Sequence, residues 1–162
     1  MHLGQTYILL LLAEAYGRDE QEEEGLQILA KALALVEHTG EYFNQAELYR
    51  FKGELMLQRT SQKSKIETRP RPLTLSSQEA EACFLKAIEI AQQQQAKLLE
   101  LRATVSLARL WYQEGKSTAA RRVLEPLYAW FTEGFTTADL RAAKSLLDSL
   151  ASASPDQDAA LE

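Results

Sequence analysis

The chain has 162 residues, 46% of them hydrophobic and 25% charged, which is enough to form one folded domain with a continuous core. Only seven Gly and four Pro interrupt it, and this composition predicts an all-α fold. A net charge of −5 argues against a nucleic-acid-binding surface. The single cysteine, Cys83, excludes an internal disulfide, and with only two distant histidines it disfavours a metal site. Both facts suit a reducing cytoplasm.

The first two predicted helices form an antiparallel pair. The first covers residues 3–16 and ends at Gly17, a good helix breaker. The second follows Asp19, which forms a capping-box pattern with Glu22. An apolar run at the start of the chain, from Ile8 to Leu12, superficially resembles a signal peptide. No Lys or Arg precedes it, however, and it is too short to span a bilayer.

The third and fourth helices are expected on either side of a long loop. The third covers residues 41–58 and buries an apolar set made up of Phe43, Ala46, Leu48, Leu55 and Met56. Residues 59–77 are expected to form the loop, because Pro70 and Pro72 oppose a helix. The loop is either a tolerated surface excursion or a basic docking segment for an acidic partner. The fourth helix is expected to begin at Ser76, as its N-cap, and to end near residue 94.

Two further helices lie within residues 101–128 and are separated by Gly115. The segment 115–118 imitates the end of a nucleotide-binding P-loop, but Leu110 stands where that motif needs Gly and a helix precedes it, which argues against nucleotide binding. Ser117 is expected to cap the sixth helix and Pro126 to bend it. A seventh helix, 136–150, would cover the apolar end of the array. Residues 151–162 form a polar, disordered tail, and its final Leu-Glu matches an expression-vector remnant.

Small and large residues recur in the same order in three helix pairs, and this order resembles the tetratricopeptide (TPR) repeat. The matching positions are Leu12, Ala13, Tyr16, Gly25, Leu29, Ala32 and Leu33; then Gly53, Met56, Ala80, Phe84, Ala87 and Ile88; then Leu107, Ala108, Trp111, Gly115, Ala120, Leu124 and Leu127. The repeats are expected over about 3–40, 41–95 and 96–133. The resemblance implies a right-handed TPR-like α-solenoid of three antiparallel helix pairs, with a period of about 40 residues, plus a C-terminal capping helix.

In TPR arrays the first helix of each pair lines a concave groove that binds proteins or peptides. By the same register, the resemblance places eight residues there: Tyr7, Glu14, Glu47, Arg50, Glu54, Arg102, Arg109 and Tyr112. Acidic residues dominate the first two pairs and basic residues the third, a separation that would orient a bipolar peptide or helix. Ordinary solubilising charges are the alternative. The Lys and Asn of repeats that clamp chaperone carboxylates are replaced here by Leu10 and Glu14, which argues against that kind of recognition.

No catalytic constellation is found in the sequence. No Ser, Cys or Thr has a convincing His partner, and Cys83 is expected to be a small core residue. The sequence therefore predicts no enzyme activity, no cofactor and no metal.

Four segments, 11–17, 46–57, 79–111 and 128–150, resemble the C-terminal end of large bacterial signalling ATPases of the STAND type, often fused to class III adenylate/guanylate cyclase or protein kinase domains. The segment WFTEGF, 130–135, is the most specific part. The resemblance implies a cytoplasmic regulatory module that binds a protein, a peptide or upstream domains of the same polypeptide. No ATPase or cyclase motif is present, so no residue is carried over from those domains. The alternative is a structural module that forms homodimers through the apolar first helix, from Ile8 to Leu12.

Overall fold

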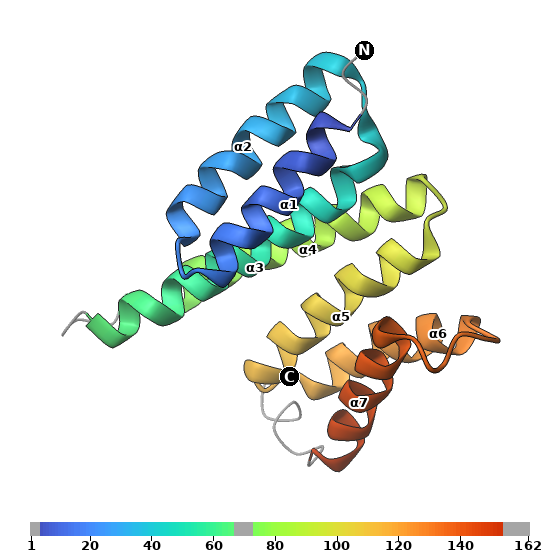
Figure 1. The fold of residues 1–162 in the computed structure, drawn as a ribbon. Helices are drawn as coiled ribbons and strands as arrows, with labels where there is room; N and C mark the ends of the chain where they lie inside the picture. Colours follow the sequence, from blue (N-terminus) through green and yellow to red (C-terminus); the bar gives the residue numbers. More distant parts are fainter. Residues whose placement is uncertain (1–3, 67–72, 154–162) are drawn as a thin grey trace.

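The computed structural model describes residues 4–66 and 73–153, and these residues form helices joined by short turns (Figure 1). One turn of 3-10 helix, η1, precedes the third α-helix. The elements in chain order are α1 (Gln5–Arg18), α2 (Glu22–Thr39), η1 (Tyr42–Asn44), α3 (Gln45–Ile66), α4 (Leu73–Gln93), α5 (Lys97–Gln113), α6 (Ser117–Trp130) and α7 (Ala138–Ser152). Within the described ranges no helix is both long and apolar enough to cross a membrane.

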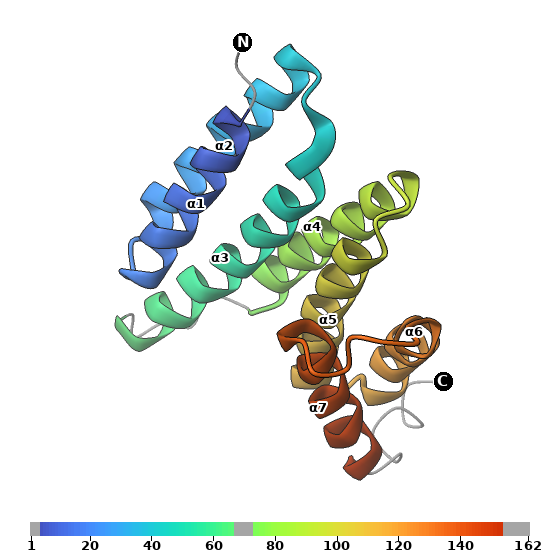
Figure 2. The ribbon, with the colours of Figure 1, turned by 45° about the vertical axis from the view of Figure 1, so that its right-hand side comes forward.

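Each helix packs mainly on its neighbours along the chain. α1 pairs with α2, α3 with α4 and α5 with α6, and each pair also contacts the next through α2·α3 and α4·α5 (Figures 1 and 2). The first helices of successive pairs also touch, through α1·α3 and α3·α5, and α7 continues the series by packing on α5 and α6. Contacts of this nearest-neighbour kind define a solenoid. The chain is a TPR-like α-solenoid, as the sequence predicts.

The recurring small residues lie where two helices cross closely. Ala13, Ala108 and Ala120 are fully buried, and they let neighbouring backbones approach. At Gly53 the approach is closest, because a Cβ there would lie 2.6 Å from Cε1 of Phe84. The ring of Phe84 occupies this space and is itself 1% exposed. The small and large positions of the repeat therefore fit together across each helix pair.

The long loop predicted over residues 59–77 is wrong in its extent. α3 continues to Ile66 and α4 begins at Leu73, so these two helices take up most of the inserted residues. The hydroxyl groups of Thr60 and Ser61 donate to the carbonyl oxygens four residues earlier, which lets both polar residues sit inside a helix. Pro70 and Pro72 restrict only their immediate neighbourhood, and residues 67–72 lie outside the described residues.

Three helix ends share one type of turn, and only the turn at Gly115 was predicted from the sequence. Glu20, Gln95 and Gly115 have positive φ values of 58°, 53° and 80°, and the amide of the next residue donates to the carbonyl five residues earlier. This is the left-handed helix end of a Schellman motif. The N-caps predicted at Asp19, Ser76 and Ser117 are wrong, because α2 begins after Gln21, α4 already begins at Leu73 and α6 begins after Lys116.

Gly17 does not end α1, although it was predicted to do so. It lies within the helix, where a Cβ would come 2.7 Å from Cδ2 of Leu55, and its carbonyl accepts a hydrogen bond of 2.8 Å from Nε2 of Gln58. Close packing of α1 on α3, and not helix termination, explains this glycine. Phe43 was predicted to be buried, and this too is wrong: its side chain is 82% exposed on η1.

The C-terminal end of the array agrees with the prediction of a capping helix. α7 buries Leu140, Ala143, Leu146 and Leu150 against α5 and α6, with Leu147 partly buried beside them. α6 passes through Pro126 and continues to Trp130. α7 ends at Ser152, so the predicted tail loses its first two residues to the helix. The rest of the predicted tail, from residue 154 to residue 162, lies outside the described residues.

Candidate partner-binding groove

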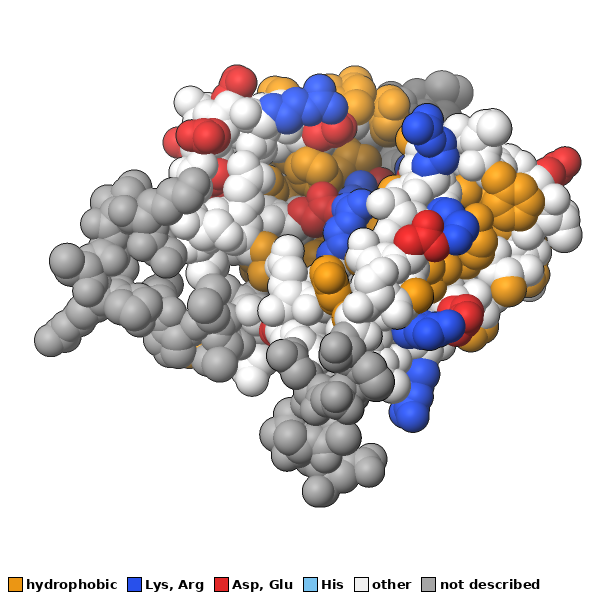
Figure 3. All heavy atoms as spheres, turned by 90° about the horizontal axis from the view of Figure 1, so that it is seen from below, with side chains coloured by type: hydrophobic (Ala, Val, Ile, Leu, Met, Phe, Trp, Pro, Cys, Tyr) orange, Lys and Arg blue, Asp and Glu red, His pale blue; other side chains and the backbone are white. Residues whose placement is uncertain are grey.

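One hollow of about 340 Å³ lies on the side of the array lined by the first helices of the pairs. α1, α3, α5 and α7 all contribute to it, and Figure 3 shows acidic and basic side chains next to one another on this face, with hydrophobic ones around them. Six of the eight residues predicted for the groove line this hollow: Glu14, Glu47, Arg50, Glu54, Arg102 and Arg109. Tyr7 lines an adjoining hollow, and Tyr112 lines neither of them.

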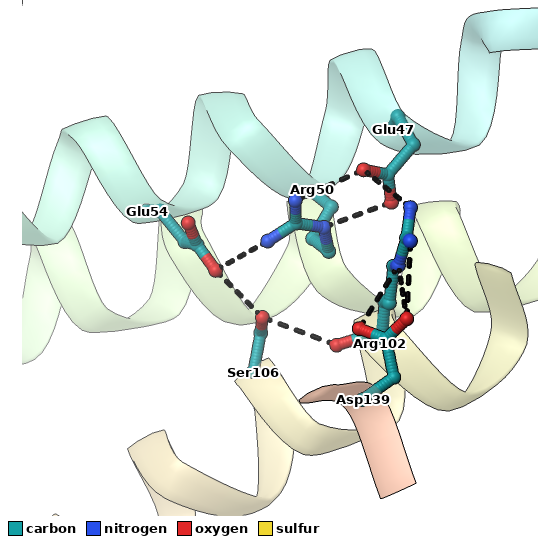
Figure 4. A network of polar contacts seen from close by, with 6 residues as sticks. All are labelled: Glu47, Arg50, Glu54, Arg102, Ser106 and Asp139. Carbon is teal, nitrogen blue, oxygen red and sulfur yellow. Dashed lines mark hydrogen bonds and ion pairs between the residues drawn. The ribbon is translucent and has the colours of Figure 1, made fainter. Parts of the chain in front are cut away.

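The side chain of Arg50 is only 17% exposed in the hollow, and two carboxylates of its own helix hold it (Figure 4). Its Nε and Nη2 each donate to one oxygen of Glu47 at 2.9 Å, and its Nη1 donates to Oε1 of Glu54 at 2.6 Å. Burial by itself would lower the pKa of Arg50, but the hydrogen bonds and charges of Glu47 and Glu54 raise that pKa above its ordinary value. The guanidinium is therefore a fixed, permanently charged part of the groove wall.

Arg102 on α5 joins three helices. Its Nε donates to both oxygens of Asp139 on α7 at 3.1 Å, and its Nη2 lies 3.0 Å from Oδ2 of the same residue. Its Nη1 lies 3.7 Å from Oε2 of Glu47 on α3. A bidentate pair of this kind fixes orientation as well as charge. Arg102 consequently helps to set the position of α7 relative to α5 and α3.

Ser106 adds a second link between α5 and α3. Its hydroxyl lies 2.8 Å from Oε1 of Glu54 and 3.2 Å from the carbonyl oxygen of Arg102, and it can donate to either acceptor (Figure 4). Ser106 is 6% exposed, so this hydrogen bond forms away from bulk water. The groove floor is thus a connected polar network that includes residues of α3, α5 and α7.

The charge separation predicted along the groove is largely cancelled by this pairing. Arg50 neutralises acids on its own helix, Arg102 is held by Asp139, and Glu14 pairs with Arg18 at 2.7 Å. Arg109 is exposed and, within the described part of the chain, makes no hydrogen bond or ion pair. Asp139 and Ser106 were not predicted as groove residues, because in the sequence Asp139 has the position of an N-terminal helix residue and Ser106 that of an ordinary helix residue.

A second hollow, of about 870 Å³, continues the first toward the N-terminal ends of α1 and α5. It shares Leu10, Glu14, Glu47 and Arg102 with the charged hollow. Its remaining lining is mainly apolar and comes from α1, from the η1 turn and from the start of α5. This part of the lining includes Tyr7, Leu11, Phe43, Leu98 and Leu99. The groove therefore has a charged part and an apolar part.

The metal-ligand clusters and the cysteine considered in the sequence can be compared with the described residues. Among residues 4–66 and 73–153, no group of three or more His, Cys, Asp or Glu side chains converges as a metal site would require. Cys83 is 8% exposed, and burial raises the pKa of its thiol, with Lys52 acting in the opposite direction. Cys83 is a core residue of α4, as predicted.

No protein-family model matches the chain, and no curated protein matches it. Among solved structures, the chain is similar to that of a Podospora anserina putative kinesin light chain with nearly identical TPR-like repeats. The two share 19% sequence identity, the match covers 99% of this chain and 91% of the other, and the TM-score is 0.46.

Proposed function

We propose that the chain is a protein-interaction and regulatory module that binds a protein or peptide in its concave groove. The observation that carries this proposal is the convergence of side chains from α1, α3, α5 and α7 on one hollow. A surface built from four alternate helices suits a long ligand such as a peptide or helix, which contacts several repeats at once. The polar network holds the wall in place before a partner arrives, and this reduces the entropy lost on binding.

The polar side chains of the groove are better suited to binding than to catalysis. Arg50, Glu47 and Glu54 are committed to one another, and Arg102 is committed to Asp139. A general acid or base must be free to exchange a proton with a substrate, whereas these groups are fixed by charged partners. We therefore propose a scaffold or sensor role and no enzymatic activity.

We further propose that the module is the C-terminal part of a larger bacterial signalling protein with a STAND-type ATPase and a cyclase or kinase domain. The support is the sequence resemblance of residues 128–150 and of the three segments before them. Sequencing the native reading frame upstream of the codon for Met1 tests this context. Further helix pairs and a P-loop ATPase are expected there, and a different domain type would contradict the proposal.

Site-specific photo-cross-linking tests the groove itself. A photoreactive amino acid replaces Arg109 in the groove or, as a matched control, the exposed Arg122 on α6, and the variants are irradiated in cells. Both positions are exposed arginines on helices, so the substitutions are comparable. We expect one protein to be cross-linked reproducibly from position 109 and not from position 122. Cross-linking only from position 122, or from neither, would contradict binding in the groove.

Self-association through α1 is the second candidate function, and the exposure of its apolar residues favours it. Ile8 is 65% exposed and Leu12 43%, although both are large and apolar. Light scattering on the chain and on the Ile8→Asp variant separates the two candidates. A stable dimer that the substitution dissociates would support self-association, and a monomer at high concentration would exclude it.

A further inference from the structure

Exposed apolar side chains from three parts of the described chain line the apolar hollow at one end of the groove. Phe43 is 82% exposed, Tyr7 51%, Leu11 46% and Leu98 43%, and all four line the same hollow. They come from η1, from α1 and from the start of α5, so the fold itself brings them together. Isolated exposed apolar residues are ordinary, whereas a shared concave patch of this kind marks an interaction site.

The charges at the edge of this hollow already have partners on the same chain. Lys97 lies 2.8 Å from Glu100 and above the ring of Trp130, at 5.7 Å from its centroid. Arg102 is held by Asp139, and Glu47 by Arg50. A charged group of a ligand would therefore lose its water here without gaining a free counter-ion. The complementary surface is one that is apolar and uncharged.

We propose that this hollow receives the uncharged apolar stripe of an amphipathic helix from a partner protein, an inference that rests on the groove function proposed above. Its walls are helices, α1 and α5, and the described residues contain no strand whose edge could pair with an extended peptide. An amphipathic helix presents apolar side chains at i, i+4 and i+7 along one face. Such a face fits an open hollow lined by Tyr7, Leu11, Phe43 and Leu98.

The charged hollow next to it acts as the boundary of the apolar contact. Arg102 and Glu47 line both hollows, and their charges are already paired. A ligand helix that extends over them therefore meets a polar surface that needs no charged group from the ligand. The inference therefore predicts binding that depends on apolar side chains and only weakly on salt. A bipolar peptide, which the charge pattern of the sequence suggested, would show the opposite behaviour.

Selection from a displayed library of random peptides of about 15 residues, with the whole 162-residue chain as the immobilised target, provides the probe. We expect the selected peptides to carry apolar residues at i, i+4 and i+7, with no shared acidic or basic position, and to become helical on binding. Their affinity is expected to change less than about threefold between about 0.05 M and about 0.5 M salt.

Two substitutions of exposed residues locate the bound peptide. Phe43→Ala is expected to weaken binding about tenfold or more, because it removes the most exposed apolar side chain of the hollow. Leu85→Ala removes another large exposed apolar side chain, from α4 and outside the hollow, and is expected to change binding less than about twofold. Circular dichroism and the melting temperature check that both variants keep the fold.

Several results would overturn the inference. They are a selection that yields no binder, peptides with a charged or proline-rich consensus, binding that disappears at high salt, and equal binding to the Phe43→Ala variant. Failure here remains distinguishable from failure of the groove function. If cross-linking from position 109 persists in the Phe43→Ala variant, the groove function is retained and the apolar hollow is refuted as its anchor. If position 109 gives no cross-link even in the protein that keeps Phe43, both proposals are refuted.

Discussion

The helices at the two ends of the solenoid differ in how much of their apolar surface is buried. α7, at one end, buries a single stripe that includes Leu140 and Leu150, at 3% and 4% exposure. α1, at the other end, buries Leu10 and Ala13 but leaves Ile8 and Leu12 largely in the open. A helix that ends an array needs one apolar face, whereas a helix inside an array needs two. α7 has the pattern of a terminal helix, and α1 has the pattern of an internal one.

The largest loss of stability is expected from removing the side chain of Trp111, which contacts two neighbouring buried clusters. Trp111 packs against the buried cluster of α5–α7 and against the buried cluster of α4 and α5, and its Nε1 donates to Glu81 at 3.1 Å. Trp111→Ala is expected to lower the free energy of unfolding by about 3 to 5 kcal/mol, measured by urea denaturation. Trp130→Ala, at a 58% exposed position, is the control and should cost far less. An unchanged stability of the first variant would show that Trp111 is not a core residue.

The same substitution at each end tests the comparison directly. Leu150→Ala in α7 is expected to destabilise the fold by about 2 to 4 kcal/mol, because it leaves a cavity under the capping helix. Leu12→Ala in α1 is expected to cost less than about 1 kcal/mol, because that side chain is already 43% exposed. Thermal and urea unfolding of both variants measure the difference. Similar losses at the two positions would mean that α1 is covered in solution, as a homodimer would require.

The ion pairs of α7 are expected to matter less than its apolar stripe. Arg102→Ala removes the bidentate contact with Asp139 and is expected to cost about 1 kcal/mol, a value kept small because the Arg102 side chain is 37% exposed. The double variant with Asp139→Asn should cost little more than the single one, since the interaction is already lost. Urea denaturation at low and high salt measures both. A loss comparable with that of Leu150→Ala would show that charge, and not apolar burial, holds the cap.

The smallest effect is expected at the turns with positive φ. Gln95 joins α4 to α5 with a φ of 53°, and Glu20 joins α1 to α2 with a φ of 58°. Replacing either by Gly is expected to raise the free energy of unfolding by about 0.5 kcal/mol, because Gly adopts this conformation without steric cost but loses more backbone entropy on folding. Equal gains in the free energy of unfolding, measured by chemical denaturation, would show that the α1–α2 pair unfolds together with the rest of the solenoid. A gain from Gln95→Gly alone would show that the α1–α2 pair unfolds separately.

The sequence predicted the fold well because the repeat pattern records helix crossings. Ala13, Gly53 and Ala108 occupy the same repeat position, and each is buried where two helices meet. Helix ends were predicted less well, since Glu20 and Gln95 adopt a conformation that is usually assigned to Gly. Pro70 and Pro72 also suggested far more loop than the structure contains, because a proline restricts only its near neighbours.

The candidate groove was predictable by position but not by interaction. Register alone brought Glu47, Arg50 and Arg102 to the concave side, and the structure places them around one hollow. Their pairing depends on Asp139, which lies 37 positions from Arg102 in the sequence and belongs to a helix outside the repeats. The exposure of Phe43 was missed for a similar reason: an apolar residue near a helix start reads as core unless the turn before the helix is known.

The nearest-neighbour arrangement of the helices also determines how the native state opens. α1 packs mainly on α2 and to a lesser degree on α3, whereas α5 contacts α3, α4, α6 and α7. Separating α1 from the array therefore disrupts one large interface and one small one, while opening α5 requires the loss of its contacts with four helices. Amide hydrogens of α1 and α2 should exchange with deuterium through partial opening, and those of α5 only through global unfolding. A partner that covers α1 would slow the first process without changing the second, which makes exchange at this end a direct report of occupancy.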